Sequence, residues 1–132
     1  MERQVVAGES LPQQIGPYSH AVAAGGFLFV SGQPGIDPRT GEPVGPAFEE
    51  QARQALTNLE AVLRAGGSRP DLVVSTTVLV ADQADFAAMN ELFAAFFPTA
   101  PPTRMTMQVP LPHGLRFSIG CTAVVAEGEG PR

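Results

Sequence analysis

Hydrophobic and polar residues follow one another along this chain in patterns that predict a hairpin near its start. Residues 19–31, reading SHAVAAGGFLFVS, hold two apolar runs on either side of Gly25 and Gly26. A glycine pair supplies the positive φ angles that a tight hairpin turn requires. Residues 32–46 are dense in glycine and proline, so we expect a loop of ordered turns after the hairpin.

Two later segments have the three- and four-residue apolar spacing of amphipathic helices. The first covers about residues 48–63, carries acidic residues in its first turn and is closed by a pair of glycines. The second covers about residues 84–97, with Asp82 or Asp85 as its N-cap, and three prolines follow it. Its phenylalanine and methionine stripe is predicted to pack in the core.

Three further segments have the composition of strands. Residues 72–80 are rich in β-branched side chains and predict a central strand, and residues 103–109 and 115–125 predict two more. Val5 and Val6 indicate a short edge strand near the start of the chain.

The element order, hairpin, helix, strand, helix and two strands, predicts an α+β fold with the helices on one face of a mixed sheet. The length of 132 residues suits a single domain over 1–132, with a frayed polar tail at 127–132. The other sheet face must then meet solvent, a ligand or another subunit. A charged fraction of only 16% favours a subunit.

Charge and cysteine content narrow the functional class. The formal net charge is −5 and the chain has no lysine, so the basic footprint of a nucleic-acid-binding protein is absent and small-molecule partners are favoured. We see no signal peptide and no apolar run of membrane-spanning length, and we expect a cytoplasmic protein without a membrane partner. His20 and His113 stand apart from other metal-ligand residue types, so no metal site is predicted.

The segment 101–108, reading PPTRMTMQ, carries the strongest chemical signal. Alternation along this predicted strand places Arg104, Thr106 and Gln108 on one face, where Arg104 is the only charge. A guanidinium in a half-buried sheet needs a partner, because an unpaired buried charge is strongly unfavourable. That partner is either a carboxylate from elsewhere in the fold or an anionic ligand.

Five separated blocks of the sequence resemble the RidA (YjgF) family, and the resemblance covers about residues 13–126. The blocks are IGPYSHAV at 15–22, FVSGQPGIDPRTGE at 29–42, QARQALTNLEAVL at 51–63, MNELFAAFF at 89–97 and PPTRMT at 101–106. The resemblance implies a chorismate-mutase-like fold with two helices on one face of a six-stranded sheet. It also implies a homotrimer with ligand sites at the subunit interfaces.

The same resemblance implies an activity: hydrolysis of enamines and imines such as 2-aminoacrylate and 2-aminocrotonate to 2-keto acids and ammonia, with no cofactor. Arg104 matches the family arginine that grips the substrate carboxylate. The positions implied to contact substrate beside it are Tyr18, Ser31, Gly32, Asn90 and Thr106. From the residues alone, Arg104 also fits a structural ion pair, Tyr18 an interface aromatic and Asn90 a local hydrogen bond.

One position departs from the family pattern. Active members carry a glutamate in the last strand that orients water and passes protons, and Gly120 falls at that position when one deletion is allowed in the preceding turn. Cys121 points to the other strand face, so it does not replace the acid, and it is predicted to be a small buried hydrophobe.

Two functional hypotheses follow from this departure. In the first, the protein is a deaminase in which the water is held, in place of the glutamate, by Ser118, Thr106 or Gln108. In the second, the protein is a non-catalytic trimeric module that binds small carboxylates or keto acids. A third hypothesis, a redox-switched holdase or an RNA-acting protein, fits poorly with a net charge of −5.

Overall fold

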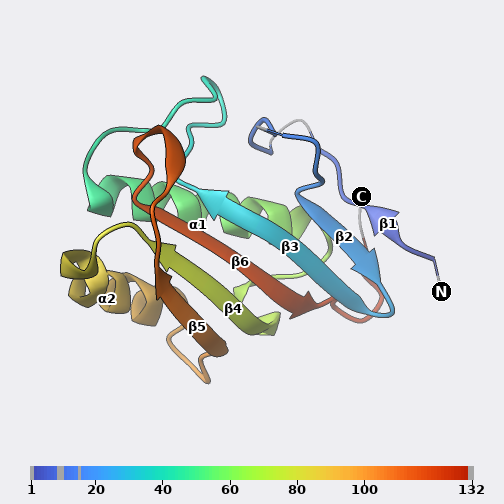
Figure 1. Cartoon of the computed structure of the whole chain (residues 1–132). Coiled ribbons are helices and arrows are strands. Elements are labelled where there is room, and N and C mark those ends of the chain that lie inside the picture. The colour runs from blue at the N-terminus through green and yellow to red at the C-terminus, as the bar shows by residue number, and fades with distance from the viewer. Residues whose placement is uncertain (1, 9–10, 15, 131–132) are drawn as a thin grey trace.

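The computed structural model describes residues 2–8, 11–14 and 16–130 and contains one six-stranded sheet with two α-helices on one face (Figure 1). The strand order is β1-β2-β3-β6-β4-β5, and only β4 and β5 are parallel. The elements are β1 (Gln4–Val5), β2 (Ala21–Ala24), β3 (Phe27–Pro34), α1 (Phe48–Ala65), β4 (Val73–Val80), α2 (Phe86–Phe96), β5 (Thr103–Gln108) and β6 (Phe117–Val124). The predicted α+β, chorismate-mutase-like architecture is confirmed.

Glycines at turns form the predicted boundaries. Gly25 and Gly26 have φ angles of 61° and 85°, which is the positive-φ pair of a tight hairpin between β2 and β3. Gly67 has φ 80° just after α1, and the Ser68 N–H donates to Leu63 O at 2.8 Å to close the helix end.

The structure at the start of the second helix shows which role each of the two candidate N-cap residues has. A 3₁₀ turn covers Gln83–Asp85, and α2 begins at Phe86. The Asp82 carboxylate accepts from the Ala84 N–H at 2.9 Å, so Asp82 caps this 3₁₀ turn, while Asp85 stands at the N-cap position of α2 without a side-chain capping hydrogen bond. Asp85 instead forms an ion pair with Arg116 at 2.7 Å.

One boundary predicted from the sequence needs correction. The loop expected from residue 32 begins later, because β3 continues to Pro34 across a β-bulge between Val30 and Gln33. In the described part of the tail, the Glu129 N–H donates to Ala126 O in a turn, and fraying of the tail stays a prediction. Residues 131–132 lie outside the described residues, as does Ile15 of the first resemblance block.

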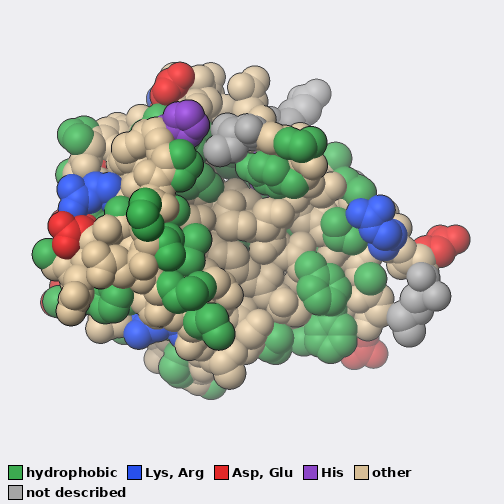
Figure 2. Space-filling view, in the orientation of Figure 1, with side chains coloured by type: hydrophobic (Ala, Val, Ile, Leu, Met, Phe, Trp, Pro, Cys, Tyr) green, Lys and Arg blue, Asp and Glu red, His purple; other side chains and the backbone are tan. Residues whose placement is uncertain are grey.

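The core lies between the helices and one sheet face, around Leu59, Leu63, Val78, Met89 and Ile119. The opposite face, called the open face below, is not covered by any described element. Its exposed apolar side chains are Phe27, Phe29, Met105 and Met107, and Figure 2 shows such side chains on both sides of a polar centre.

Both helices therefore lie on one side, as predicted, and a subunit on the open face stays a prediction. Within the described residues, no helix is long and apolar enough to cross a bilayer.

Candidate functional site

Arg104 is exposed rather than half-buried, because β5 is the edge strand of the sheet. Its guanidinium carbon lies 5.0 Å from the centroid of the Phe93 ring, and its Nη1 lies 3.6 Å from the Met89 sulfur. Both partners belong to α2, so the side chain lies on the helix side of the sheet. An aromatic face beneath a guanidinium holds its plane while leaving its N–H donors open to an anion.

Ion pairing sets Arg104 apart from most other arginines. Five arginines pair with a nearby carboxylate: Arg39 with Asp37, Arg53 with Glu49, Arg64 with Glu60, Arg69 with Asp71, and Arg116 with Asp85. Over the described ranges, only Arg3 and Arg104 lack such a pair. Of the two partners left open for Arg104, a carboxylate is therefore not observed among the described residues.

Three further predicted residues belong to β5 or to α2, the strand that carries Arg104 and the helix that it contacts. Thr106 pairs with the core residue Val78 in the parallel register, and its Oγ1 is buried with no hydrogen-bond partner among the described residues. Gln108 is exposed at the end of β5, and Asn90 is exposed on α2 beside Met89. We call Arg104, Thr106, Gln108 and Asn90 the edge cluster.

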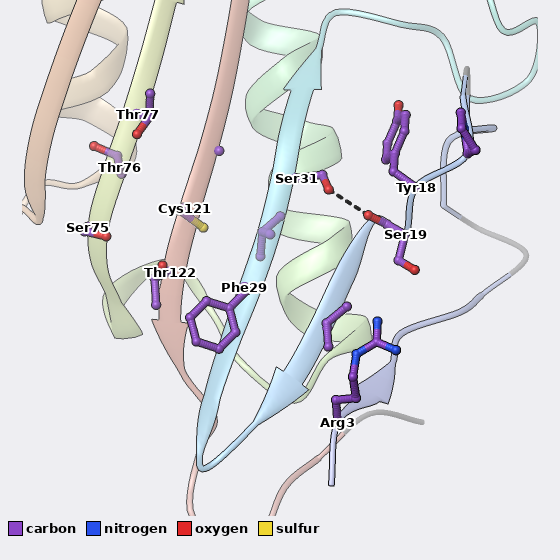
Figure 3. Close-up of a pocket in the computed structure, with 14 residues that line it drawn as sticks. Arg3, Tyr18, Ser19, Phe29, Ser31, Ser75, Thr76, Thr77, Cys121 and Thr122 are labelled. Atoms are coloured by element: carbon purple, nitrogen blue, oxygen red, sulfur yellow. Dashed lines mark hydrogen bonds between the residues drawn. The ribbon is translucent and has the colours of Figure 1, made fainter. Parts of the chain in front are cut away.

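A groove of about 660 Å³ lies on the open face, and we call it the open-face groove (Figure 3). It contains three predicted site residues: Tyr18, Ser31 and Gly120. The full lining is Arg3, Pro17, Tyr18, Ser19, Val22, Phe29, Val30, Ser31, Ser75, Thr76, Thr77, Gly120, Cys121 and Thr122. The wall is rich in hydroxyl groups and includes no aspartate or glutamate among the residues described.

The β3 bulge positions the remaining predicted residues. Ser31 Oγ donates to Ser19 O at 2.7 Å, and a Cβ added at Gly32 would lie 2.8 Å from Ser118 Oγ. A Cβ added at Gly120 would lie 3.2 Å from Val30 O and 3.3 Å from the Gly32 nitrogen. A side chain at 120 would thus press on the backbone of β3, whereas Ser118 already places a polar group beside the bulge.

The edge cluster and the groove lie on opposite sides of the sheet. Arg104 pairs with Thr76 of β4, while Gly120 pairs with the next residue, Thr77. Successive strand residues point to opposite faces, so Arg104 and Gly120 do too. Arg104 and Gly120 were predicted to belong to one site, and a single chain does not bring them together.

Cys121 faces the helix side, paired with Thr76, and is only 8% exposed. Burial raises the pKa of the thiol to about 12, so it is protonated and unreactive at neutral pH. The predicted small buried hydrophobe is confirmed. His113 has φ 58° in a short turn, as expected of a turn residue, and no group of three metal-ligating side chains occurs in the described part of the chain.

Part of the groove wall was not predicted from the sequence. Ser75, Thr77 and Thr122 could have been assigned to it from the alternation of their strands, because each shares the face of Gly120. Arg3 also lines the groove, and no sequence signal marks it, because the packing of β1 beside β2 is a tertiary feature.

Comparisons with known proteins agree with this architecture. The family model described as endoribonuclease L-PSP matches residues 8–125. A mouse protein named 2-iminobutanoate/2-iminopropanoate deaminase is 42% identical over 130 residues, covering 98% of this chain and 93% of the relative. The chloroplastic Reactive Intermediate Deaminase A of Arabidopsis thaliana is 40% identical over 126 residues, covering 95% of this chain and 67% of the relative.

Solved structures give the same result. RidA from an Antarctic Psychrobacter species superimposes with a TM-score of 0.88 at 35% identity, covering 92% of this chain and 99% of the other. TdcF from E. coli, solved with bound serine, gives a TM-score of 0.83 at 34% identity, covering 92% and 98%. The chain belongs to the RidA (YjgF) family.

Proposed function

We propose that this protein is an enamine/imine deaminase that converts 2-aminoacrylate-type enamines and their imines, with water, to 2-keto acids and ammonia. The observation that carries the proposal is Arg104: an exposed guanidinium on an aromatic platform, with no carboxylate partner in the described chain. The names of the mouse and Arabidopsis relatives support the same chemistry.

We further propose that a complete site forms between two copies of the chain in a homotrimer. The edge cluster and the open-face groove lie on opposite faces, so a ligand held by Arg104 does not reach Ser31 of the same chain. Phe29 and Met105, 49% and 60% exposed on the open face, support association of copies there.

In this arrangement Arg104 binds the substrate carboxylate, and Thr106 lies on the same strand face with a buried hydroxyl that has no hydrogen-bond partner among the described residues. Tyr18 and Ser31 of the next copy shape the cavity around the amino group. The carbon of the enamine gains a proton, water adds to the resulting iminium carbon, and ammonia leaves. Ser118 is our proposed water-positioning group, because its hydroxyl lies beside the β3 bulge. No cofactor takes part in these steps.

The family description as an endoribonuclease suggests a different substrate, which the charge of this chain does not favour. RNA binding relies on lysine and arginine contacts to phosphate, and the chain has no lysine and a net charge of −5. Five of its eight arginines are already ion-paired. We therefore propose small imino acids rather than RNA as substrates.

A specific observation favours a second candidate, a trimeric module that binds small carboxylates or keto acids without turnover. The described residues that line the groove include no aspartate or glutamate, and Gly120 has none of the acid–base chemistry predicted for its position.

The two candidates are separated by an assay and a binding measurement made on the same preparation. We expect 2-keto acid release from enzymatically generated 2-aminoacrylate to be faster with the protein than without it. Calorimetry with 2-ketobutyrate should show binding in both cases. Binding without acceleration would support the module, and neither binding nor acceleration would refute both candidates.

A further inference from the structure

A chain of buried hydrogen bonds lies beneath the open-face groove and is centred on His20. His20 is 6% exposed and Gln33 is 1% exposed, both far below what is usual for polar side chains on a small protein. The His20 Nε2 contacts Pro12 O, and its Nδ1 lies 3.2 Å from Gln33 Nε2. The same Gln33 nitrogen donates to Ser31 O at 3.1 Å.

The carbonyl groups of Pro12 and Ser31 lie at the two ends of this series of hydrogen bonds, and they determine which atom donates in each bond. Pro12 O only accepts, so the His20 Nε2 carries a hydrogen. Ser31 O also only accepts, so the Gln33 amide presents its NH₂ group to Ser31 and to His20 Nδ1. His20 Nδ1 must therefore accept, which is possible only in the neutral imidazole.

These hydrogen bonds join the two segments that carry the predicted groove residues Tyr18 and Ser31. His20 lies two residues after Tyr18, and the two rings meet edge to face with centroids 6.3 Å apart. The Ser31 N–H donates to His20 O at 2.9 Å. Gln33 points into the protein only because the β3 bulge shifts the register at Ser31 and Gly32. One imidazole thus contacts the Tyr18 segment, the segment around Pro12 and, through Gln33, the bulge.

We propose that neutral His20 is a positioning residue that holds Tyr18 and the Ser31–Gly32 bulge in a single geometry. The structural part of this proposal concerns the folded chain alone. Its consequence for turnover rests on the proposed deaminase function.

Protonation of His20 disrupts this arrangement for a geometric reason. A hydrogen on Nδ1 points at the NH₂ group of Gln33, and reversing the Gln33 amide places its oxygen against Ser31 O. Tyr18 is the one titratable side chain that faces His20 among its described neighbours. The other described side chains around the ring carry no charge, so no described carboxylate stabilises an imidazolium there.

The chain offers a direct readout because Tyr18 is its only tyrosine. Tyrosine labelled with ¹³C in the ring gives NMR signals from Tyr18 alone, without any need for turnover. We expect His20→Leu to shift and broaden these signals. His20→Gln should keep them near their wild-type positions, because glutamine presents both an acceptor to Gln33 and a donor to Pro12 O. Ser68→Ala is the matched control, since Ser68 is also 6% exposed and its hydroxyl donates to Val124 O, and neither residue lines the groove.

Kinetic constants supply a second comparison that a purely structural role would not predict. In the deaminase assay, His20→Leu should raise KM by roughly tenfold, the size expected from one lost buried hydrogen bond, with a smaller change in kcat.

Superimposable Tyr18 signals in wild type and His20→Leu would overturn the proposal, as would Tyr18 signals in His20→Gln that are displaced as far as those in His20→Leu. If His20→Leu does not fold, the comparison of His20→Gln with wild type decides alone. Failure of the deaminase assay leaves the NMR result intact, so the two proposals fail separately.

Discussion

The edge cluster and the open-face groove differ in how the chain satisfies their polar groups. In the groove, Ser31 Oγ donates to Ser19 O, and Gln33 donates to Ser31 O from beneath. At the edge, Arg104 has only a ring and a sulfur as partners, and Thr106 Oγ1 has none among the described residues. The groove is therefore organised within one chain. The edge has unused hydrogen-bonding capacity, which a ligand or a second copy can satisfy.

Arg104→Ala should give the largest effect, because it removes the only proposed anion-binding charge. Loss of a charge-assisted contact predicts a fall in kcat/KM of roughly a hundredfold. The folded chain loses only the contact over Phe93, about 0.5–1 kcal/mol of stability. Steady-state kinetics and thermal unfolding measure the two effects separately.

Arg53→Ala is the charge-matched control. Arg53 is exposed on α1 and pairs with Glu49, so its removal changes the net charge equally but should leave kcat/KM unchanged. Equal losses in the two variants would show that Arg104 acts only through overall charge.

A mixing experiment tests whether the two halves come from different copies. Arg104→Ala disables the edge, and Ser31→Phe places a bulky ring in the groove. If each site takes one half from each of two neighbours, random mixing should return about a quarter of wild-type activity, because each half is intact with a probability of about one half. Co-expression with two affinity tags isolates mixed trimers, in which one site of the three is intact, so the isolated sample should show about a third of wild-type activity. Activity no higher than that of the separate variants would place both halves in one chain.

Glutamate substitutions compare two positions in the groove strand, β6. Ser118→Glu should raise imine hydrolysis several-fold if a missing carboxylate limits turnover. Gly120→Glu should instead lower the free energy of unfolding by about 1–3 kcal/mol, because its Cβ presses on the backbone of β3. Assay and denaturant unfolding of both variants test this. A stable and faster Gly120→Glu protein would reverse the assignment of the two positions.

The sequence predicted local features more accurately than features that depend on distant strands. The Gly25–Gly26 hairpin and the first helix depend on neighbouring residues, and both formed as expected. Strand alternation also placed Arg104 and Thr106 on a shared face. The choice of face depends on the pairing of β5 and β6 with β4, and that register is not encoded in either strand alone.

The same limit explains the remaining differences. The bulge that turns Gln33 inward depends on the pairing of β3 with β6. It was not predicted, because the sequence from residue 32 onward has the glycine and proline content of a loop. Arg104 is exposed because β5 is an edge strand of the sheet. The sequence of β5 alone does not specify that position.

Cys121 gives the smallest expected effect and tests the assignment of faces. It belongs to the strand of Gly120 but faces the helix side, where burial raises its pKa to about 12. An unfolded thiol ionises near about 8.5, so at pH 8 the native thiol should react with iodoacetamide at least about a hundredfold more slowly than the denatured one. Because the chain has one cysteine, mass spectrometry counts a single modification.

The same shift predicts a pH dependence of stability. The folded state holds the neutral thiol, so its contribution is complete below the unfolded pKa and is lost as pH rises toward about 12. Between pH 8 and about pH 11, the free energy of unfolding should fall more for wild type than for Cys121→Ala. Rapid native alkylation, or parallel pH curves for the two proteins, would mean that the thiol opens to the groove and that the sheet faces are assigned incorrectly. Slow alkylation with diverging curves would place the Cys121 side chain with the core and leave the groove to the side of β6 that carries Gly120 and Thr122.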